Sequence, residues 1–267
     1  MGILNVTPDS FSDGGIYLDP QRAIAQAHEL AQAGADIIDI GAESSRPGSE
    51  PVSAAEELTR LRPALNALAG KLNIPISVDT YKSQVAQEAI ELGAQMINDI
   101  SGLRFDPQMP PLLAKYKIPV VIMHIRGAPK TMQQNLHYES FLPEVILYLK
   151  QSIVLAERAG IEPGQIVIDP GIGFGKTVNQ NLQLINRLAE FKTLGKPILI
   201  GPSRKSFIGQ VLNLPPGQRE EGTAAAVACG ILNGAHIVRV HDVAKMSRVV
   251  RMVDAIRQAG GCHDVLG

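Results

Sequence analysis

The sequence lacks tryptophan, and only 4% of its 267 residues are aromatic. It contains two cysteines, Cys229 and Cys262, with neither CxxC spacing nor a histidine cluster nearby. This pattern argues against a disulfide scaffold and against a zinc site of the common type, and it favours a reduced, cytoplasmic protein. Cys229 lies in an alanine-rich run, so we expect it to be a small core residue.

The sequence also lacks a large excess of either positive or negative charge, and it lacks long apolar runs. The formal net charge is −1 and the pI is about 6.6, which argues against nucleic acid or an anionic membrane surface as a partner. No apolar run approaches the roughly 18 residues that a membrane span needs. The first five residues do not resemble a signal peptide. With 45% hydrophobic residues, the chain can still bury a sizeable core.

What the sequence does contain is a recurring unit: a short apolar run, a polar residue at its end, a loop and a helical pattern. The eight runs cover residues 2–5, 36–40, 75–79, 94–99, 119–124, 166–169, 197–201 and 236–241. Continuous apolarity is typical of parallel strands that are buried on both faces. Eight such units predict an α/β fold, a single-domain (β/α)8 TIM barrel over residues 1–267. A doubly wound sheet is the structural alternative.

Polar side chains stand near the carboxyl ends of these runs, where the active site of a barrel lies. They are Asn5, Glu43 with Ser45 and Arg46, Asp79, Asn98, Met123 with His124, Asp169, Lys205, and Arg239 with His241. The acidic and amide groups can match a planar amino-pyrimidinone edge. The basic groups and Asn5 suit phosphate oxygens. Phe11 and Phe174 offer either a stacking surface or an anchor for their own loops.

Three familiar motifs do not apply. The stretch 171–177 lacks the first glycine of a phosphate-binding P-loop, because Pro170 occupies that position, and it fails the dinucleotide fingerprint at Lys176. Ser203 has no nucleophile-elbow context. The six histidines show no metal-ligand spacing.

Five segments together resemble the dihydropteroate synthase family, the folate-pathway enzymes inhibited by sulfonamides. They are residues 5–15, 43–48, 169–176, 203–206 and 239–242, and they occur in the family's order along the whole chain. The resemblance implies a homodimeric pterin-binding transferase that uses Mg²⁺. Such an enzyme joins 6-hydroxymethyl-7,8-dihydropterin diphosphate to 4-aminobenzoate, giving 7,8-dihydropteroate and pyrophosphate by a dissociative substitution.

The resemblance also implies roles for individual residues. The pterin would be held by Asp79, Asn98, Met123, Asp169 and Lys205, and the diphosphate by Asn5, Arg46, Arg239 and His241. The 4-aminobenzoate site would comprise Phe11, Ser45, Arg46, Pro47, Phe174, Ser203 and Lys205. The metal would touch Asn5 and Asp13. The catalytic residues would be Arg239, His241, Lys205, Asp79 and Asp169.

Two features depart from the family pattern. Family members usually carry residues ahead of the first strand that help to close the bottom of the barrel, whereas this sequence opens on that strand, which puts stability in doubt. Ser45 stands where many members have threonine, and we expect a modest effect because the hydroxyl is kept.

Two alternatives share parts of this pattern. A methyltransferase-type pterin-binding barrel would share the pterin carboxylates but would have no reason for an anion site at Arg239 and His241. An inactive pterin-binding module would tolerate the loss of loop residues such as Phe11 and Arg46, yet both are present.

Overall fold

The computed structural model describes residues 1–6 and 20–259. Short strands alternate with helices along the chain, as the sequence pattern predicts. The strands are β1 (Gly2–Asn5), β2 (Ile38–Gly41), β3 (Ile76–Asp79), β4 (Met96–Asp99), β5 (Val120–Met123), β6 (Ile166–Asp169), β7 (Leu199–Ile200) and β8 (Ile237–Val238). Each predicted run overlaps one of them; β2 extends one residue past its predicted end, and the last two strands have only two residues each.

The strands form a closed parallel barrel. β1 to β6 pair in chain order, and β7 pairs with β8. Backbone hydrogen bonds close the two remaining seams: Ile168 N–H donates to Pro197 O at 2.9 Å, and Ile3 N–H donates to Val240 O at 3.0 Å. Parallel bridges lie at the same two places. The closed barrel is therefore confirmed, and the alternative of an open doubly wound sheet is wrong.

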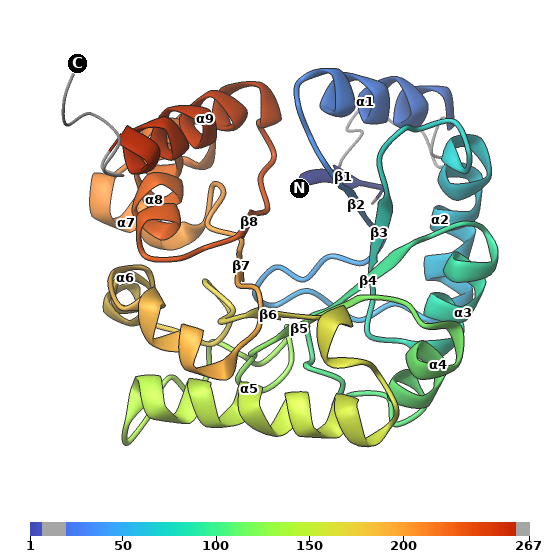
Figure 1. Ribbon diagram of the computed structural model, residues 1–267, viewed down its shortest axis with the longest axis horizontal. Helices are drawn as coiled ribbons and strands as arrows, with labels where there is room; N and C mark the ends of the chain where they lie inside the picture. Colours follow the sequence, from blue (N-terminus) through green and yellow to red (C-terminus); the bar gives the residue numbers. More distant parts are fainter. Residues whose placement is uncertain (7–19, 260–267) are drawn as a thin grey trace, which may run out of the picture.

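The helices surround the strands (Figure 1). They are α1 (Pro20–Gln32), α2 (Ala54–Leu68), α3 (Ser83–Glu91), α4 (Met109–Tyr116), α5 (Phe141–Arg158), α6 (Val178–Asn186), α7 (Ser206–Leu212), α8 (Glu220–Leu232) and α9 (Val243–Ala259). Short 3-10 turns cover Pro163–Gln165, Leu188–Leu194 and Pro216–Gln218. Across the described ranges, 1–6 and 20–259, no helix combines the length and apolarity that crossing a bilayer requires.

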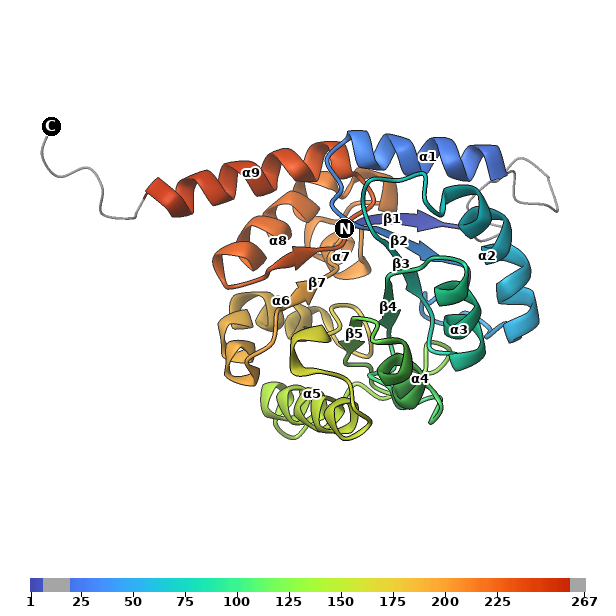
Figure 2. The ribbon, with the colours of Figure 1, turned by 45° about the vertical axis from the view of Figure 1, so that its right-hand side comes forward.

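Helix starts follow the capping chemistry in the sequence. The Ser53 side chain accepts from Glu56 N–H at 3.1 Å at the start of α2, and Asp242 accepts from Lys245 N–H at 3.0 Å at the start of α9. The helical ring also closes, because α9 lies beside α1 (Figures 1 and 2), where Ser247 Oγ donates to Ala33 O at 3.0 Å.

Two apolar layers follow from this arrangement. The larger fills the space between strands and helices, and a smaller cluster that includes Met1, Val121, Val167 and Leu199 fills the barrel. Cys229 is exposed, so the expectation of a core cysteine is wrong. Its helix, α8, is apolar on nearly every side, and periodicity could not tell its inner face from its outer face.

Candidate functional site

A buried ion-pair network crosses the carboxyl end of the barrel. Arg239, which follows β8, donates from Nε to Asp39 Oδ2 at 2.6 Å and from Nη2 to Asp79 Oδ2 at 2.8 Å. Asn98 Nδ2 donates to the same Asp39 oxygen at 3.1 Å. Three neighbouring strands, β2, β3 and β4, and the segment after β8 therefore deliver interacting groups to one point, as the barrel geometry predicts.

Burial dominates the electrostatics of this network. Burial and the negative charge of Asp39 raise the pKa of Asp79 to about 7, against the opposing effect of Arg239. For Arg239, burial acts to lower the pKa, but the two aspartates outweigh it and the pKa is raised. The network therefore combines a permanent cation with a carboxyl group that can carry a proton near neutral pH.

The loop after β6 wraps around a buried lysine. Lys176 Nζ donates to Gly171 O at 2.8 Å and to Phe174 O at 2.9 Å, and it lies 2.8 Å from His124 Nδ1. Burial lowers the pKa of Lys176 well below its usual range, and the nearby Asp169 opposes this effect. The amine thus donates hydrogen bonds to backbone carbonyl oxygens of a tight, buried loop, which would otherwise lack partners.

Gly171 makes this loop possible. Its φ of +73° lies in the left-handed region, and a Cβ at this position would fall 1.9 Å from His124 O. Gly171 N–H donates to Asp169 Oδ1 at 2.7 Å, which fixes the carboxylate at the end of β6. Burial raises the pKa of Asp169, and Lys205 opposes this rise.

Lys205 and two apolar side chains form one wall of the site. Lys205 Nζ lies 4.4 Å from the centre of the Phe174 ring and donates to Ile172 O. Burial lowers its pKa to about 8, partly offset by Asp169. Phe174 and Met123 belong to a small apolar cluster, separate from the main core, that also includes Ile100.

His241 is held by Ser203. The serine Oγ lies 2.9 Å from His241 Nδ1 and accepts from the His241 backbone N–H at 3.2 Å. Burial, together with the charges of Arg239, Arg204, Lys205 and Arg46, lowers the pKa of His241 to about 4. The imidazole is therefore neutral at pH 7, and its Nε2 can donate a hydrogen bond when Nδ1 accepts from Ser203.

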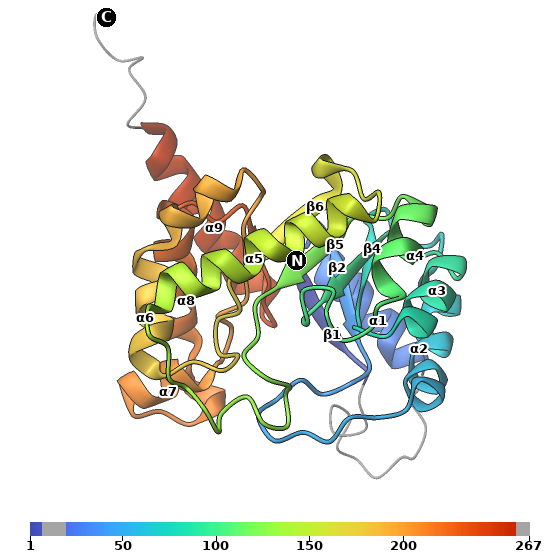
Figure 3. The same cartoon turned by 90° about the horizontal axis from the view of Figure 1, so that it is seen from below.

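The loop after β2 carries the remaining predicted groups. Ser45 is half-buried, whereas Arg46 and Pro47 are exposed. Gly48 N–H donates to Pro129 O at 3.1 Å, and Figure 3 shows this loop beside the loop that follows β5. The charge of Arg46 reaches His241, as the lowered pKa of that histidine indicates.

Asn5 lies at the end of β1. Its Oδ1 would be 3.9 Å from a Cβ on Gly41, and Asp79 Oδ2 would be 3.8 Å from the same point. Asp79 Oδ2 already accepts from Arg239 Nη2, whereas the amide oxygen of Asn5 is of the kind that Mg²⁺ prefers. Within the described ranges, no group of three or more His, Cys, Asp or Glu side chains could hold a metal ion. Phe11 and Asp13 lie outside the described residues.

The structure thus brings most predicted residues to one face. It also shows three residues to which the sequence assigned no role: Asp39, Lys176 and Asp99. Asp99 accepts from Ser101 N–H at 2.6 Å, and burial raises its pKa to about 6. Asp39 could have been found, because a carboxylate inside a continuous apolar run needs a partner when the strand is buried.

Comparison with known proteins agrees with this geometry. The model of the family described as pterin binding enzyme matches residues 1–241. Dihydropteroate synthase from Bacillus subtilis is 49% identical over 263 residues, covering 98% of this chain and 90% of the relative.

Two solved structures match over nearly their whole length. A Clostridium difficile dihydropteroate synthase determined with pteroic acid has a TM-score of 0.90 at 47% identity, covering 96% of this chain and 95% of that one. A Xanthomonas albilineans enzyme with 4-aminobenzoic acid has a TM-score of 0.90 at 42% identity, covering 96% and 92%. Fold, site and sequence agree, and the chain belongs to the dihydropteroate synthase family of pterin-binding enzymes.

Proposed function

We propose that this protein is a transferase of folate synthesis that joins 6-hydroxymethyl-7,8-dihydropterin diphosphate to 4-aminobenzoate, releasing 7,8-dihydropteroate and pyrophosphate. The observation that carries the proposal is the placement of acidic and amide groups beside cations on one barrel face. Asp79 accepts from Arg239 there, and Asn98 is linked to Arg239 through Asp39. His241 follows Arg239 two residues later. A pterin needs the first kind of group and a diphosphate needs the second.

The pterin ring would lie among Asp79, Asn98 and Asp169. Its ring N–H and amino groups would donate to the two carboxylates, and the amide of Asn98 can both donate and accept. Met123 and Phe174 supply an apolar wall beside these polar groups. Lys205, next to the Phe174 ring, would complete the pocket by donating to a ring acceptor.

The diphosphate would lie against Asn5, Arg46, Arg239 and His241. The difficult step is the breaking of the carbon–oxygen bond to diphosphate, because the arylamine is already neutral at pH 7. Arg239 and the neutral His241 would donate hydrogen bonds to the departing oxygens, which is charge stabilisation at the place where charge develops. Asp79 and Asp169 would stabilise the positive charge left on the pterin methylene. These roles favour a dissociative substitution.

The acceptor would bind last, between the loop after β2 and the wall that carries Lys205. Ser45, Arg46, Pro47, Phe174, Ser203 and Lys205 would form this site together with Phe11. After the diphosphate oxygen has left with the bonding electrons, the amine nitrogen forms a bond to the cationic methylene carbon, and the nitrogen then loses a proton to solvent or to the released pyrophosphate.

The oxygen atoms of Asn5 and Asp13 fit Mg²⁺, which favours carboxylate and carbonyl ligands together with substrate phosphates. When bound, the ion would neutralise charge on the diphosphate. The position of Asn5 at the end of β1, on the barrel face that carries Arg239, supports this assignment.

We further propose one pterin-binding domain over residues 1–267, a cytoplasmic location and a homodimer. A groove between α6, α7 and α8 supports the dimer, because Leu182, Val211 and Leu212 are exposed around it at 42%, 55% and 44%. Contiguous apolar patches of this kind usually mark an interface. Analytical ultracentrifugation of Val211→Glu should show a monomer, and an unchanged dimer would place the interface elsewhere.

The deciding assay measures pyrophosphate release by the purified protein with pterin diphosphate and Mg²⁺. Release that requires 4-aminobenzoate and falls when a sulfonamide is added would support the synthase. Tight pterin binding without release would contradict it and point to a binding module or to a methyltransferase-type barrel.

A further inference from the structure

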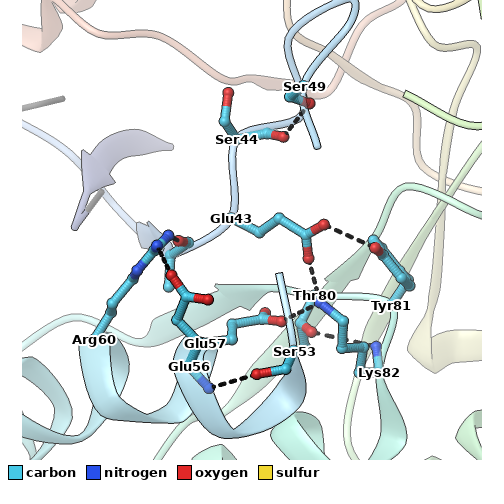
Figure 4. A network of polar contacts seen from close by, with 11 residues as sticks. Glu43, Ser44, Ser49, Ser53, Glu56, Glu57, Arg60, Thr80, Tyr81 and Lys82 are labelled. Atoms are coloured by element: carbon cyan, nitrogen blue, oxygen red, sulfur yellow. Dashed lines mark hydrogen bonds and ion pairs between the residues drawn. The ribbon is translucent and has the colours of Figure 1, made fainter. Parts of the chain in front are cut away.

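A polar network joins the loop after β2 to two helices on the outside of the barrel (Figure 4). Lys82 precedes α3, and its Nζ donates to Glu57 Oε2 on α2 at 2.6 Å and to Glu43 Oε2 in the loop. Tyr81 OH donates to the other Glu43 oxygen, Oε1, at 2.8 Å. Both oxygens of Glu43 are therefore held by residues that directly follow β3.

The side chains of this network are largely buried, and burial strengthens the ion pairs between them. The side chain of Glu57 is fully buried, and those of Glu43 and Lys82 are 10% and 18% exposed. One cation serves two carboxylates, and burial raises the pKa of Glu57 while Lys82 opposes the rise. If Lys82 were to leave, two acids would remain in a low-dielectric environment without a counter-charge, so the cation is held in place.

The rest of the loop is held less firmly. Ser49 Oγ donates to Ser44 O at 2.5 Å and Ser49 N–H to Arg46 O at 3.0 Å, but these bonds lie within the loop itself. One backbone bond, from Gly48 N–H to Pro129 O at 3.1 Å, reaches the loop after β5. The ion pair from Glu50 to Lys130 is 70% and 56% exposed, and exposed pairs contribute little. The enclosed bonds to Glu43 thus contribute more to the position of residues 44–49.

The network also touches the substrate side. A small cavity is lined by Glu43 and Ser45 from the loop and by Asp79, Thr80 and Tyr81 from the end of β3. A shift of Glu43 would therefore move Ser45, Arg46 and Pro47 relative to Asp79. The proposed acceptor would bind between these two parts.

We infer that Lys82 and Glu43 are positioning residues for the 4-aminobenzoate site, with Glu57 as the buried group that keeps Lys82 in place. This inference rests on the proposed function. The bond from Lys82 to Glu43 holds the loop after β2 at the distance from Asp79 that the acceptor requires, and the pterin pocket does not depend on it.

The test uses variants that leave no fully buried acid without a counter-charge. Lys82→Met combined with Glu57→Gln removes the cation together with its buried partner, and Glu43→Gln weakens the loop end while keeping the acceptor for Tyr81. The matched control is Arg62→Met with Glu88→Gln, which removes an ion pair between the same helices, α2 and α3, at 49% and 28% exposure. Lys82→Arg is the conservative variant that should restore function.

Two measurements decide the outcome. In the first two variants the KM for 4-aminobenzoate should rise about tenfold, the scale of one charge-assisted hydrogen bond, while the Kd for the pterin diphosphate and the kcat change little. Hydrogen exchange of amides 44–49 in the ligand-free protein should become faster. The control pair and Lys82→Arg should match the unchanged protein in both measurements.

The outcomes separate this inference from the proposed function. If the unchanged protein releases no pyrophosphate, the proposed function fails, and the assignment of Lys82 and Glu43 to the acceptor fails with it. If that protein is active and the variants keep the KM for 4-aminobenzoate, only the positioning role is overturned, whether or not exchange changes. An equal loss of pterin affinity and of acceptor affinity would mean a merely structural network.

Discussion

The two sides of the site are built differently. On the β6 side, Asp169, Lys176 and His124 are buried, and a lysine inside the loop gathers its carbonyl oxygens. On the β2 side, Arg46 and Pro47 are exposed, and the loop depends on the bonds to Glu43. The first side would be ready before any ligand arrives, whereas the second can adjust. The difference matches the proposed order in which pterin binds first and 4-aminobenzoate second.

The largest effect is expected from a substitution that disrupts the loop on the β6 side. Gly171→Ala places a Cβ against His124 O at a position with positive φ, and we expect a loss of about 4 kcal/mol in the free energy of unfolding, measured by urea denaturation. Gly195→Ala is the control, because its φ is +63° but no atom lies within 4 Å of the new Cβ. It should cost only about 1 kcal/mol. Equal losses would show that the backbone conformation, and not the contact, matters.

The next effect concerns the charge network between the two sides. Asp39→Asn removes a fully buried carboxylate that holds Arg239 and Asn98, so we expect about 3 kcal/mol of destabilisation and a strong loss of pterin affinity. Chemical denaturation and pterin binding measure these effects. Asp36→Asn, three residues earlier and exposed, should leave both unchanged. If Asp39→Asn bound pterin normally, the network would not organise that pocket.

A smaller effect tests the neutral histidine. The pKa of His241 is lowered from the usual 6.5 to about 4, so the unfolded chain binds more protons between these values. This contribution to stability is complete above pH 6.5 and is lost as the pH falls to 4. Asp79 acts in the opposite sense, since its raised pKa of about 7 makes stability fall as the pH rises towards that value. NMR titration of the His241 ring separates the two effects, and a midpoint near 6.5 would refute the neutral form.

The smallest effect tests how loosely the β2 side is held. Lys130→Gln removes an ion pair that is 56% and 70% exposed, and it should change neither the free energy of unfolding nor the KM for 4-aminobenzoate. Steady-state kinetics at low and at high salt provide the check. A clear rise in KM would mean that an exposed pair also positions the loop, and the contrast between the two sides would weaken.

The site residues that lie at the ends of strands could be predicted from the sequence. Asp79, Asn98, Asp169 and Arg239 each follow or finish an apolar run, and a parallel barrel brings such positions together. The role of Lys176 was harder to predict, because a lysine that follows several glycines usually faces solvent or binds phosphate. Only the folded loop shows that Lys176 donates to the backbone carbonyl oxygens of the same loop. Glu57 was hidden for a related reason: a helix pattern does not tell which charged side chain has a partner on the next helix.

The site also has a consequence for the order of synthesis. Arg239 lies 200 residues after Asp39, its partner. At about 5–20 residues per second, the ribosome needs roughly 10 to 40 s to make the intervening chain. During that interval the first strands present Asp39 and Asp79 without the guanidinium that neutralises them. Because unpaired carboxylates are costly to bury, we expect the incomplete barrel to stay open and hydrated until its last strand is made. Closure of the barrel and pairing of the charges then occur together.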